Sequence, residues 1–305
     1  MKKLLILIDR VFKKHEELAL AIEKADPNVK VFLRKIDQVD ILIGEKEIVI
    51  TVDGVDLRDF NLVFFRRVGD MHVIGSMIIY LDKMGIPFID EGLRETGIRG
   101  DKLTSLVRCF LAGAATIPTY YCNYREFDKK IPMIAKKFGY PMIAKKIHEH
   151  FLKGIYVLKN EADIALLKEH VSNVRNKRFI FEPFIDMECE YRLLVLGDEV
   201  RSINSRVMRS FEKMKVDYLD PDIDEIYLDV AEFPEEVKET AVKVAKTLNM
   251  QIAGVDICRE RVTGKNYVLE VNRGPDLNYD TTMSPELPEM VKYLSWKTEH
   301  SKLKK

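Results

Sequence analysis

Two carboxylates and one carboxamide near the carboxyl end of the chain have the spacing of a β-hairpin. Asp256 lies on one short apolar run, Glu270 and Asn272 lie on the next, and Thr263-Gly264 falls midway between the two acids. If the runs pair in antiparallel fashion about that midpoint, Asp256 lies directly opposite Glu270. Asn272 shares the face of Glu270 because side chains alternate along a strand. Three oxygen-bearing side chains therefore converge.

This arrangement calls for a cation. Like charges opposed at about 5 Å destabilise a strand pair. Apolar residues flank both acids and are expected to face the other way: Val255, Ile257, Leu269 and Val271. A site with only a few oxygen ligands leaves coordination positions open, and this suits Mg²⁺ that is held jointly by the protein and by substrate phosphates. The alternative is a solvated hairpin with incidental acids, but the apolar flanks and the shared face favour the metal site.

The composition indicates a soluble globular protein with two or more domains. The chain has 305 residues, of which 47% are hydrophobic and 32% charged. Its 49 basic and 49 acidic residues cancel, so no global charge points to nucleic acid or a membrane, although a local basic groove remains open. We therefore expect neither partner.

The cysteines and the N-terminal residues indicate in which cellular compartment the protein is expected. Four cysteines are far apart and form no C-x-x-C pair: Cys109, Cys122, Cys189 and Cys258. This usage is typical of buried thiols in a reducing cytoplasm rather than of a disulfide framework or a zinc site. The apolar run 4–8 ends at Asp9-Arg10, which is too early for a signal peptide or a spanning helix, and it predicts a first β-strand.

The first ninety residues alternate between strand-like and helical patterns. Strands are expected at 4–8, 29–33, 48–52, 62–66 and 87–89, with helices at about 11–24 and 73–84. Such alternation predicts an open α/β sheet. The glycine-containing stretch 92–100 then leads into a new unit, where Asp101 is expected to cap a helix ending at about Leu111.

The second unit has an α+β pattern. We expect strands at 142–147, 155–158, 179–185, 190–196, 199–206, 252–258 and 267–272, and helices at 124–138, 161–170, 234–248 and 285–296. Gly197-Asp198 is a strong hairpin signal between two of the strands, and a Pro- and Asp-rich loop is expected near 217–224.

A magnesium site that serves phosphates also needs phosphate donors. The chain has no P-loop, no G-x-G-x-x-G turn and no H-R-D catalytic loop. Lys145 instead projects from a predicted strand on the side of Ile143, while Lys146 points the other way. Lys145 is thus either a phosphate contact or an ordinary surface lysine.

Three further charged residues lie on the neighbouring predicted strands. Glu182 interrupts the run Phe179 to Ile185, where it either borders an apolar slot for an adenine or reaches solvent or an arginine. Arg192 and Arg206 lie where a planar donor fork can meet phosphate or carboxylate, although most arginines only solvate a surface.

Taken together, these motifs resemble the ATP-grasp enzymes, and most of all their RimK-like branch of carboxylate–amine ligases. The motifs that carry the resemblance are Lys102 after Asp101, Lys145 after Pro-Met-Ile-Ala, Glu182-Pro183-Phe184-Ile185, Glu190-Tyr191-Arg192, Gly197 to Val200, Ala253 to Ile257 and Leu269 to Pro275. The resemblance covers nearly the whole chain. It implies an open α/β pre-ATP-grasp domain at 1–97 and an ATP-grasp domain at 98–305, with a small lid subdomain at about 118–182 and a catalytic subdomain at about 183–305.

The resemblance also implies residue roles. Lys102 and Lys145 would contact ATP phosphates, with Arg192 also among the ATP-binding residues. Glu182 and the backbone of Pro183, Phe184 and Ile185 would bind adenine, and Glu190 the ribose. Asp256, Glu270 and Asn272 would hold two Mg²⁺ ions, or Mn²⁺, with Glu270 bridging them. Arg206 and Lys145 would be the catalytic residues, Arg206 steadying the phosphorylated intermediate.

The chain departs from the family pattern at two places. The phosphate loop is usually rich in glycine, but the stretch 146–153 is bulky, so we expect a hinged lid with Lys153 or a histidine as donor, or a partial loss of closure. His148 and His150 are expected to be surface residues. Arg273 stands where the family usually has a small residue, and we expect it to reach an acidic substrate or solvent.

The resulting hypothesis is a cytoplasmic ATP-dependent ligase that joins a substrate carboxylate to an amine through an acyl phosphate. The substrate is an amino acid, a peptide or a protein tail, and the family suggests a homo-oligomer. Three alternatives stay open: a nucleotide-binding regulatory module without ligase activity, a ring-forming peptide ligase, and a kinase that stops at a phosphorylated product.

Overall fold

The computed structural model describes residues 1–66, 69–95, 102–147, 154–171, 178–208 and 223–301. Its N-terminal sheet has the strand order β2-β1-β6-β7, with β1 at Lys2–Ile8, β2 at Val29–Lys35, β6 at Leu62–Phe65 and β7 at Phe88–Ile89. All of its strand pairs are parallel. The predicted open α/β sheet is therefore confirmed.

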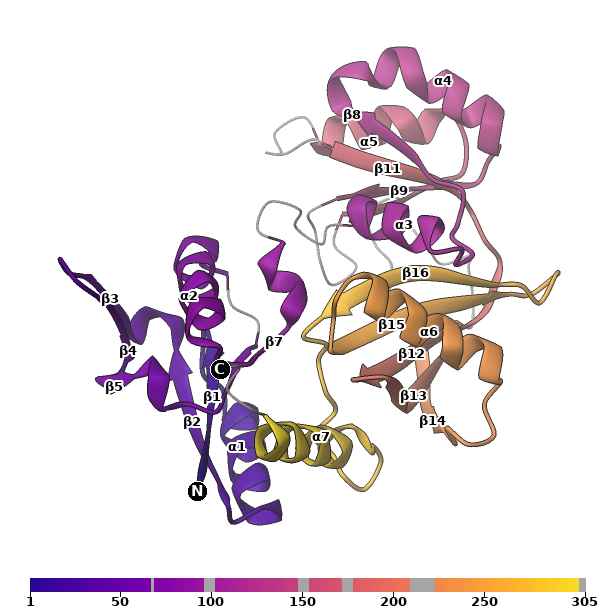
Figure 1. Ribbon diagram of the computed structural model, residues 1–305. Coiled ribbons are helices and arrows are strands. Elements are labelled where there is room, and N and C mark those ends of the chain that lie inside the picture. The colour runs from indigo at the N-terminus through magenta and orange to yellow at the C-terminus, as the bar shows by residue number, and fades with distance from the viewer. Residues whose placement is uncertain (67–68, 96–101, 148–153, 172–177, 209–222, 302–305) are drawn as a thin grey trace.

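Helices cover both faces of this sheet (Figure 1). Helix α1 (Lys13–Ala25) buries Leu18 and Ile22 against one face, and α2 (Met71–Met84) buries Ile74 and Met77 against the other. Asp70 caps α2 by accepting two backbone N–H bonds, and the left-handed Gly85 ends it. A small three-stranded sheet lies beside α2, formed by β3 (Val39–Ile43), β4 (Ile48–Val52) and β5 (Val55–Asp56). Of these three strands the sequence predicted only β4.

A second, four-stranded sheet is antiparallel, with the order β10-β9-β11-β8. Its strands are β8 (Tyr120–Asn123), β9 (Met142–Lys146), β10 (Ile155–Leu158) and β11 (Arg178–Pro183). Helices α4 (Phe127–Phe138) and α5 (Ala162–Val171) cover one face through an apolar cluster that includes Phe127 and Phe181. The other face carries Lys145 and meets α3 (Lys102–Leu111) through Leu106 and Ile180.

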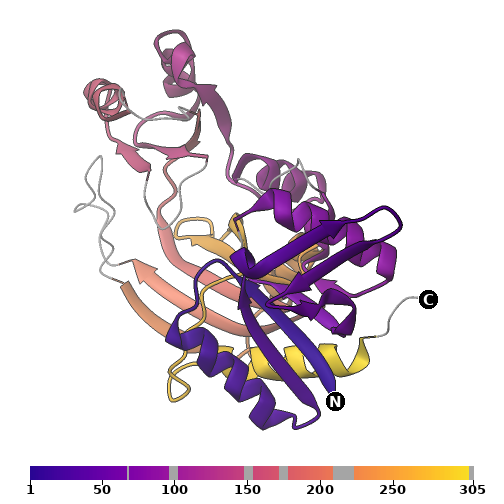
Figure 2. The ribbon, with the colours of Figure 1, turned by 90° about the vertical axis from the view of Figure 1, so that its left-hand side faces the viewer.

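The largest sheet has five antiparallel strands in the order β14-β13-β12-β15-β16. The strands are β12 (Met187–Leu196), β13 (Glu199–Met208), β14 (Ile223–Leu228), β15 (Ile252–Glu260) and β16 (Asn266–Arg273). Helix α6 (Glu235–Thr247) packs Val237, Ala241 and Val244 on one face, because these residues share one side of the helix. Helix α7 (Glu286–His300) lies between this sheet and α1, as Figures 1 and 2 show.

The predicted elements form, with differences at their ends. The sequence did not predict β8, nor β14, which begins inside the expected loop near 217–224; helix α7 continues to His300 instead of ending at Trp296. All four cysteines are buried and free, as predicted for the thiols. Among the described residues, no helix is both long and apolar enough to cross a membrane.

Candidate functional site

The β15–β16 hairpin (the metal hairpin) places the two predicted acids opposite each other. Asp256 pairs with Glu270, and Gly254 pairs with Asn272, so both acids and the amide lie on one face. Nearer the turn the pairing is Ile257 with Val268, and the register shifts by one residue between the two positions. The extra residue, Leu269, forms a β-bulge, without which Leu269 instead of Glu270 would oppose Asp256.

The bulge changes which apolar residues of the hairpin face the core. Val255, Ile257 and Val271 belong to the apolar cluster on the far face, as expected, but Leu269 does not, and Val268 takes its place there. The alternation rule fails at Leu269 because a bulged residue has no partner on the opposite strand. The convergence of the three oxygen-bearing side chains is unaffected.

One polar row crosses the large sheet at the level of Asp256. It consists of Tyr227, Asn204, Arg192, Asp256 and Glu270, one residue from each strand. Asp256 is only 5% exposed, and Arg192 donates to both of its oxygens, at 2.7 and 2.8 Å. The Nδ2 group of Asn272 donates to the same carboxylate at 3.0 Å. These donors hold Asp256 in a defined orientation.

Glu270 faces helix α3. Its Oε1 lies 3.4 Å from Nζ of Lys102, at the first residue of that helix. The Lys102 side chain is 13% exposed and that of Glu270 27%, so the pair is partly open to ligand. The structure thus brings Lys102 to the metal hairpin, from which it is far apart in the sequence.

The donor chemistry of the hairpin fits magnesium. Two carboxylates and the Oδ1 atom of Asn272 form an all-oxygen set, which Mg²⁺ prefers. No group of three or more His, Cys, Asp and Glu residues suited to a metal occurs among the described residues. An ion here would therefore be completed by the carboxamide oxygen and by oxygens from ligands, as expected for a site shared with phosphates.

The predicted nucleotide residues on the small sheet form a buried ion pair. Nζ of Lys145 lies 2.6 Å from Oε2 of Glu182, whose side chain is 3% exposed, and Thr119 donates to Oε1 at 3.2 Å. Burial, the largest single influence, lowers the pKa of Lys145, but the charge and the hydrogen bond of Glu182, together with the charges of Glu270 and Cys258, outweigh burial and raise that pKa. Glu182 is thus neither at the solvent nor beside an arginine: it holds the lysine predicted to contact phosphate.

The backbone after Glu182 is partly engaged. The N–H of Phe184 donates to the carbonyl of Pro141 at 3.1 Å, so this group is not free to bind adenine in this conformation. Pro183 has no N–H, which leaves the carbonyl groups of the segment and the N–H of Ile185 as candidates for base recognition.

Glu190 and Arg206 lie on the same face of the large sheet as the polar row, two residues from Arg192 and Asn204. They are paired across β12 and β13, with a carboxylate–guanidinium distance of 3.5 Å, and Nε of Arg206 donates to Glu225 at 2.9 Å. Burial, followed by repulsion from Asp256, raises the pKa of Glu190 to about 7, although the cations Arg206, Arg192 and Lys145 oppose the shift. A polar ligand that binds here can therefore contact both a carboxylate, Glu190, and a guanidinium, Arg206.

Arg273 has an ion-pair partner that was not predicted. Its Nε lies 3.7 Å from Oδ2 of the buried Asp90, directly after β7, while its side chain stays 28% exposed. Three partners of site residues were not predicted: Thr119, Glu225 and Asp90. Of these, only Asp90 has a recognisable sequence signal, because it is an acid directly after a predicted buried strand. Asp101, His148, His150, Lys153 and most of the loops near 206–224 lie outside the described residues.

A model of the RimK-like ATP-grasp domain matches residues 119–284, which is more than half of the chain. The chain belongs to this family. The match spans the small sheet and the metal hairpin, and it includes every predicted site residue except Lys102. The predicted ATP-grasp fold is therefore confirmed.

Related proteins and structures agree with this assignment. A D-alanine–D-alanine ligase of Clostridium botulinum (strain Alaska E43 / Type E3) is 28% identical over 278 residues, covering 84% of this chain and 87% of the relative. The structure of the ATP-grasp ligase PsnB with minimal precursor, Mg and ADP has a TM-score of 0.72 at 13% identity, covering 97% of each chain. The macrocyclase MdnC bound with precursor peptide MdnA, from Microcystis aeruginosa MRC, has a TM-score of 0.70 at 14% identity, covering 99% of this chain and 100% of that chain.

The protein is an ATP-dependent carboxylate–amine ligase of the ATP-grasp type. The predicted ligase class is thereby confirmed. The two structural likenesses, at such low identity, establish the fold alone.

Proposed function

We propose that the protein transfers the γ-phosphoryl group of ATP to a carboxylate of an amino acid or peptide, and that an amine then displaces phosphate. A carboxylate oxygen is a poor leaving group, and phosphorylation makes it a good one. In the first step a carboxylate oxygen bonds to the γ-phosphorus and ADP leaves; in the second the amine nitrogen bonds to the carbonyl carbon, loses a proton and expels phosphate. Such chemistry needs positioning and charge neutralisation, not a protein nucleophile.

The observation that carries the proposal is the polar row on the large sheet. Asp256 and Glu270 oppose each other with Asn272 on the same face, and Lys102 and Arg192 contact the two acids. We assign Asp256, Glu270 and Asn272 to Mg²⁺, which neutralises phosphate charge when bound. Lys102, Lys145 and Arg192 would bind and orient the phosphates, with Arg206 next to the acyl phosphate.

The nucleoside would lie between the small sheet and the large one. Glu182 and the backbone of 183–185 are suited to adenine, and Glu190, on the neighbouring strand of the large sheet, to the ribose hydroxyls. We also propose a cytoplasmic location, on the basis of the cysteine usage, and a homo-oligomer.

Substrate choice can be tested by ADP release. Purified protein with ATP and Mg²⁺ would be given a panel of amino acids, including D-alanine, and short peptides, with mass spectrometry of the products. We expect ADP and phosphate in equal amounts and a product that has lost one water relative to its two substrates. A product that keeps the phosphoryl group, or ADP formation that ignores every carboxylate and amine, would contradict the proposal.

A further inference from the structure

A buried acid directly after the last strand of the N-terminal sheet contacts both strands of the metal hairpin at its open end. Asp90 follows β7 and is 1% exposed. Its Oδ1 accepts the backbone N–H groups of Gln251 at 2.8 Å and Ile252 at 3.0 Å, where β15 begins. Its Oδ2 lies 3.7 Å from Nε of Arg273, where β16 ends. One carboxylate thus joins the two strands that carry the predicted magnesium ligands.

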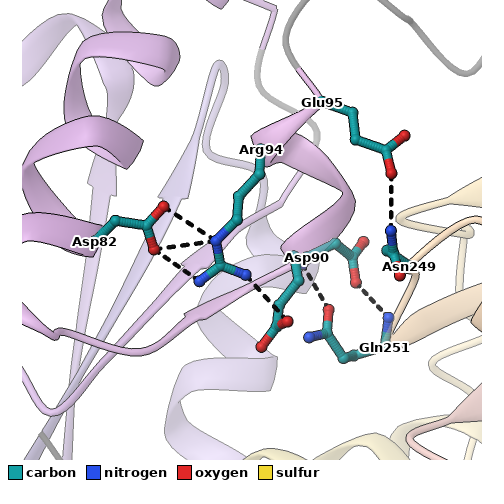
Figure 3. A network of polar contacts seen from close by, with 7 residues as sticks. Asp82, Asp90, Arg94, Glu95, Asn249 and Gln251 are labelled. Atoms are coloured by element: carbon teal, nitrogen blue, oxygen red, sulfur yellow. Dashed lines mark hydrogen bonds and ion pairs between the residues drawn. The ribbon is translucent and has the colours of Figure 1, made fainter. Parts of the chain in front are cut away.

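The segment around Asp90 fits closely against the base of the hairpin. The N–H of Glu91 donates to the side chain of Gln251 at 2.7 Å, and the N–H of Gly92 donates to the carbonyl of Asn249 at 2.8 Å. A Cβ atom on Gly92 would lie 2.6 Å from the carbonyl oxygen of Leu248, so only glycine fits. Figure 3 shows Asp90 within this network of contacts.

The contacts of Asp90 matter because β16 is an edge strand. This strand is at the edge of the large sheet, so Glu270 and Asn272 have a neighbouring strand on one side only. Toward the turn, β16 is held at Val268, whose N–H donates to the carbonyl of Ala115 at 2.8 Å. Toward its end, β16 is held at Arg273 by Asp90. The two ligands lie between these two anchors.

We propose that Asp90 is a positioning residue for the magnesium site: it fixes the open end of the metal hairpin and thereby the placement of Asp256, Glu270 and Asn272. The inference rests on the proposed magnesium role of these three residues. A carboxylate buried at this depth is costly unless it is hydrogen-bonded and paired, and all of its partners belong to the hairpin or its base. Through this contact, the N-terminal sheet acts on the metal site without touching an ion.

The experiment compares Asp90→Ala, Asp90→Asn and Arg273→Gln with the control Asp82→Asn in the full chain. Asp82 belongs to the same network, but it binds Arg94 at 2.8 and 3.0 Å and not the hairpin. Mn²⁺ binding in the presence of ADP is followed by electron paramagnetic resonance, and exchange of the Gln251 and Ile252 amides by hydrogen–deuterium exchange.

We expect Asp90→Ala to weaken Mn²⁺ binding about tenfold, as is typical for groups that orient metal ligands. Asp90→Asn keeps an acceptor for the two N–H groups and loses only the ion pair, so its effect should be smaller and should match that of Arg273→Gln. Asp82→Asn should bind Mn²⁺ as the wild type does. ADP binding without metal should be unchanged in all four variants.

Three results would overturn the proposal. The first is wild-type Mn²⁺ affinity in Asp90→Ala while the Gln251 and Ile252 amides exchange faster, which would leave Asp90 a merely structural role. The second is an equal loss of Mn²⁺ affinity in Asp82→Asn. The third is unchanged exchange of the two amides in Asp90→Ala, which would refute the role of Asp90 alone. If instead the wild type bound no Mn²⁺ with ADP, the magnesium assignment itself would fail.

Discussion

The two ends of the site each join a cation to a carboxylate, but in different ways. At the small sheet, Lys145 meets Glu182 through one contact of 2.6 Å, and the lysine stem is flexible. At the metal hairpin, Arg192 binds Asp256 with a two-pronged contact, and Asn272 adds a third bond. A lysine ammonium can move to a phosphate more readily than a guanidinium that is held by a matching fork. We infer that nucleotide binding rearranges Lys145 more than it rearranges Arg192.

The largest effect is expected at the metal hairpin. Glu270→Ala and Asp256→Asn should each lower carboxylate-dependent ADP formation by about 10³-fold, because the phosphate charge is then no longer neutralised. The rate of ADP release measures the loss. Glu260→Gln is the matched control, since Glu260 ends β15 and its side chain bonds Thr263 near the turn. Full activity in either ligand variant would remove that residue from the metal assignment.

The small sheet should respond in two separable ways. Lys145→Met should reduce kcat/KM for ATP about 10²-fold, and it should lower the free energy of unfolding by about 3 kcal/mol because Glu182 becomes a buried, unpaired charge. Adding Glu182→Gln should restore stability without restoring activity. Steady-state kinetics and urea unfolding give the two values, and Lys146→Met, on the opposite face of β9, is the control. If stability and activity recovered together in the double variant, Lys145 would serve the fold and not the phosphates.

Loss of the two-pronged contact between Arg192 and Asp256 should have a smaller effect on activity. Arg192→Lys keeps the charge and loses the two-pronged contact with Asp256, so we expect about a tenfold fall in kcat at saturating ATP. The comparison variant is Arg201→Lys on β13, whose guanidinium pairs with Glu199 and Glu289 instead. An equal fall in both would show that the geometry of the fork at Asp256 is irrelevant.

The smallest effect is the pH dependence of stability that arises from Asp90, which links the metal hairpin to the N-terminal sheet. Burial raises the pKa of Asp90 to about 6, although Arg273 and two backbone N–H groups oppose the shift. The folded state therefore holds this proton more tightly than the unfolded state, so stability is lost as pH rises through 6. The loss should be about 1 kcal/mol between pH 5 and 7. Urea unfolding at several pH values should show it in the wild type but not in Asp90→Asn, and identical pH profiles would contradict it.

The sequence predicted the metal hairpin because its signal is local. A turn and two short alternating runs predicted that Asp256, Glu270 and Asn272 converge, and a resemblance to known motifs added Lys102 and Lys145 as phosphate contacts. The bulge at Leu269 could not be predicted, because the position of an extra residue depends on packing across both faces of the sheet.

Long-range partners were harder to predict. Glu182 was expected to meet solvent or an arginine, but the antiparallel pairing of β9 and β11 puts Lys145 beside it, and pairing partners are not encoded locally. Arg273 and Asp90 are brought together by the packing of two sheets. Strand β14 was missed because it follows a Pro- and Asp-rich stretch that is typical of a loop.

The most direct test of the account is a calorimetric titration of ADP into the wild type and into Glu270→Ala, each with and without Mg²⁺. We predict that Mg²⁺ strengthens ADP binding to the wild type by at least about tenfold and has little effect in the variant, while binding without metal stays alike in both. Equal strengthening by Mg²⁺ in the two proteins would contradict the claim that the β15–β16 hairpin holds the magnesium.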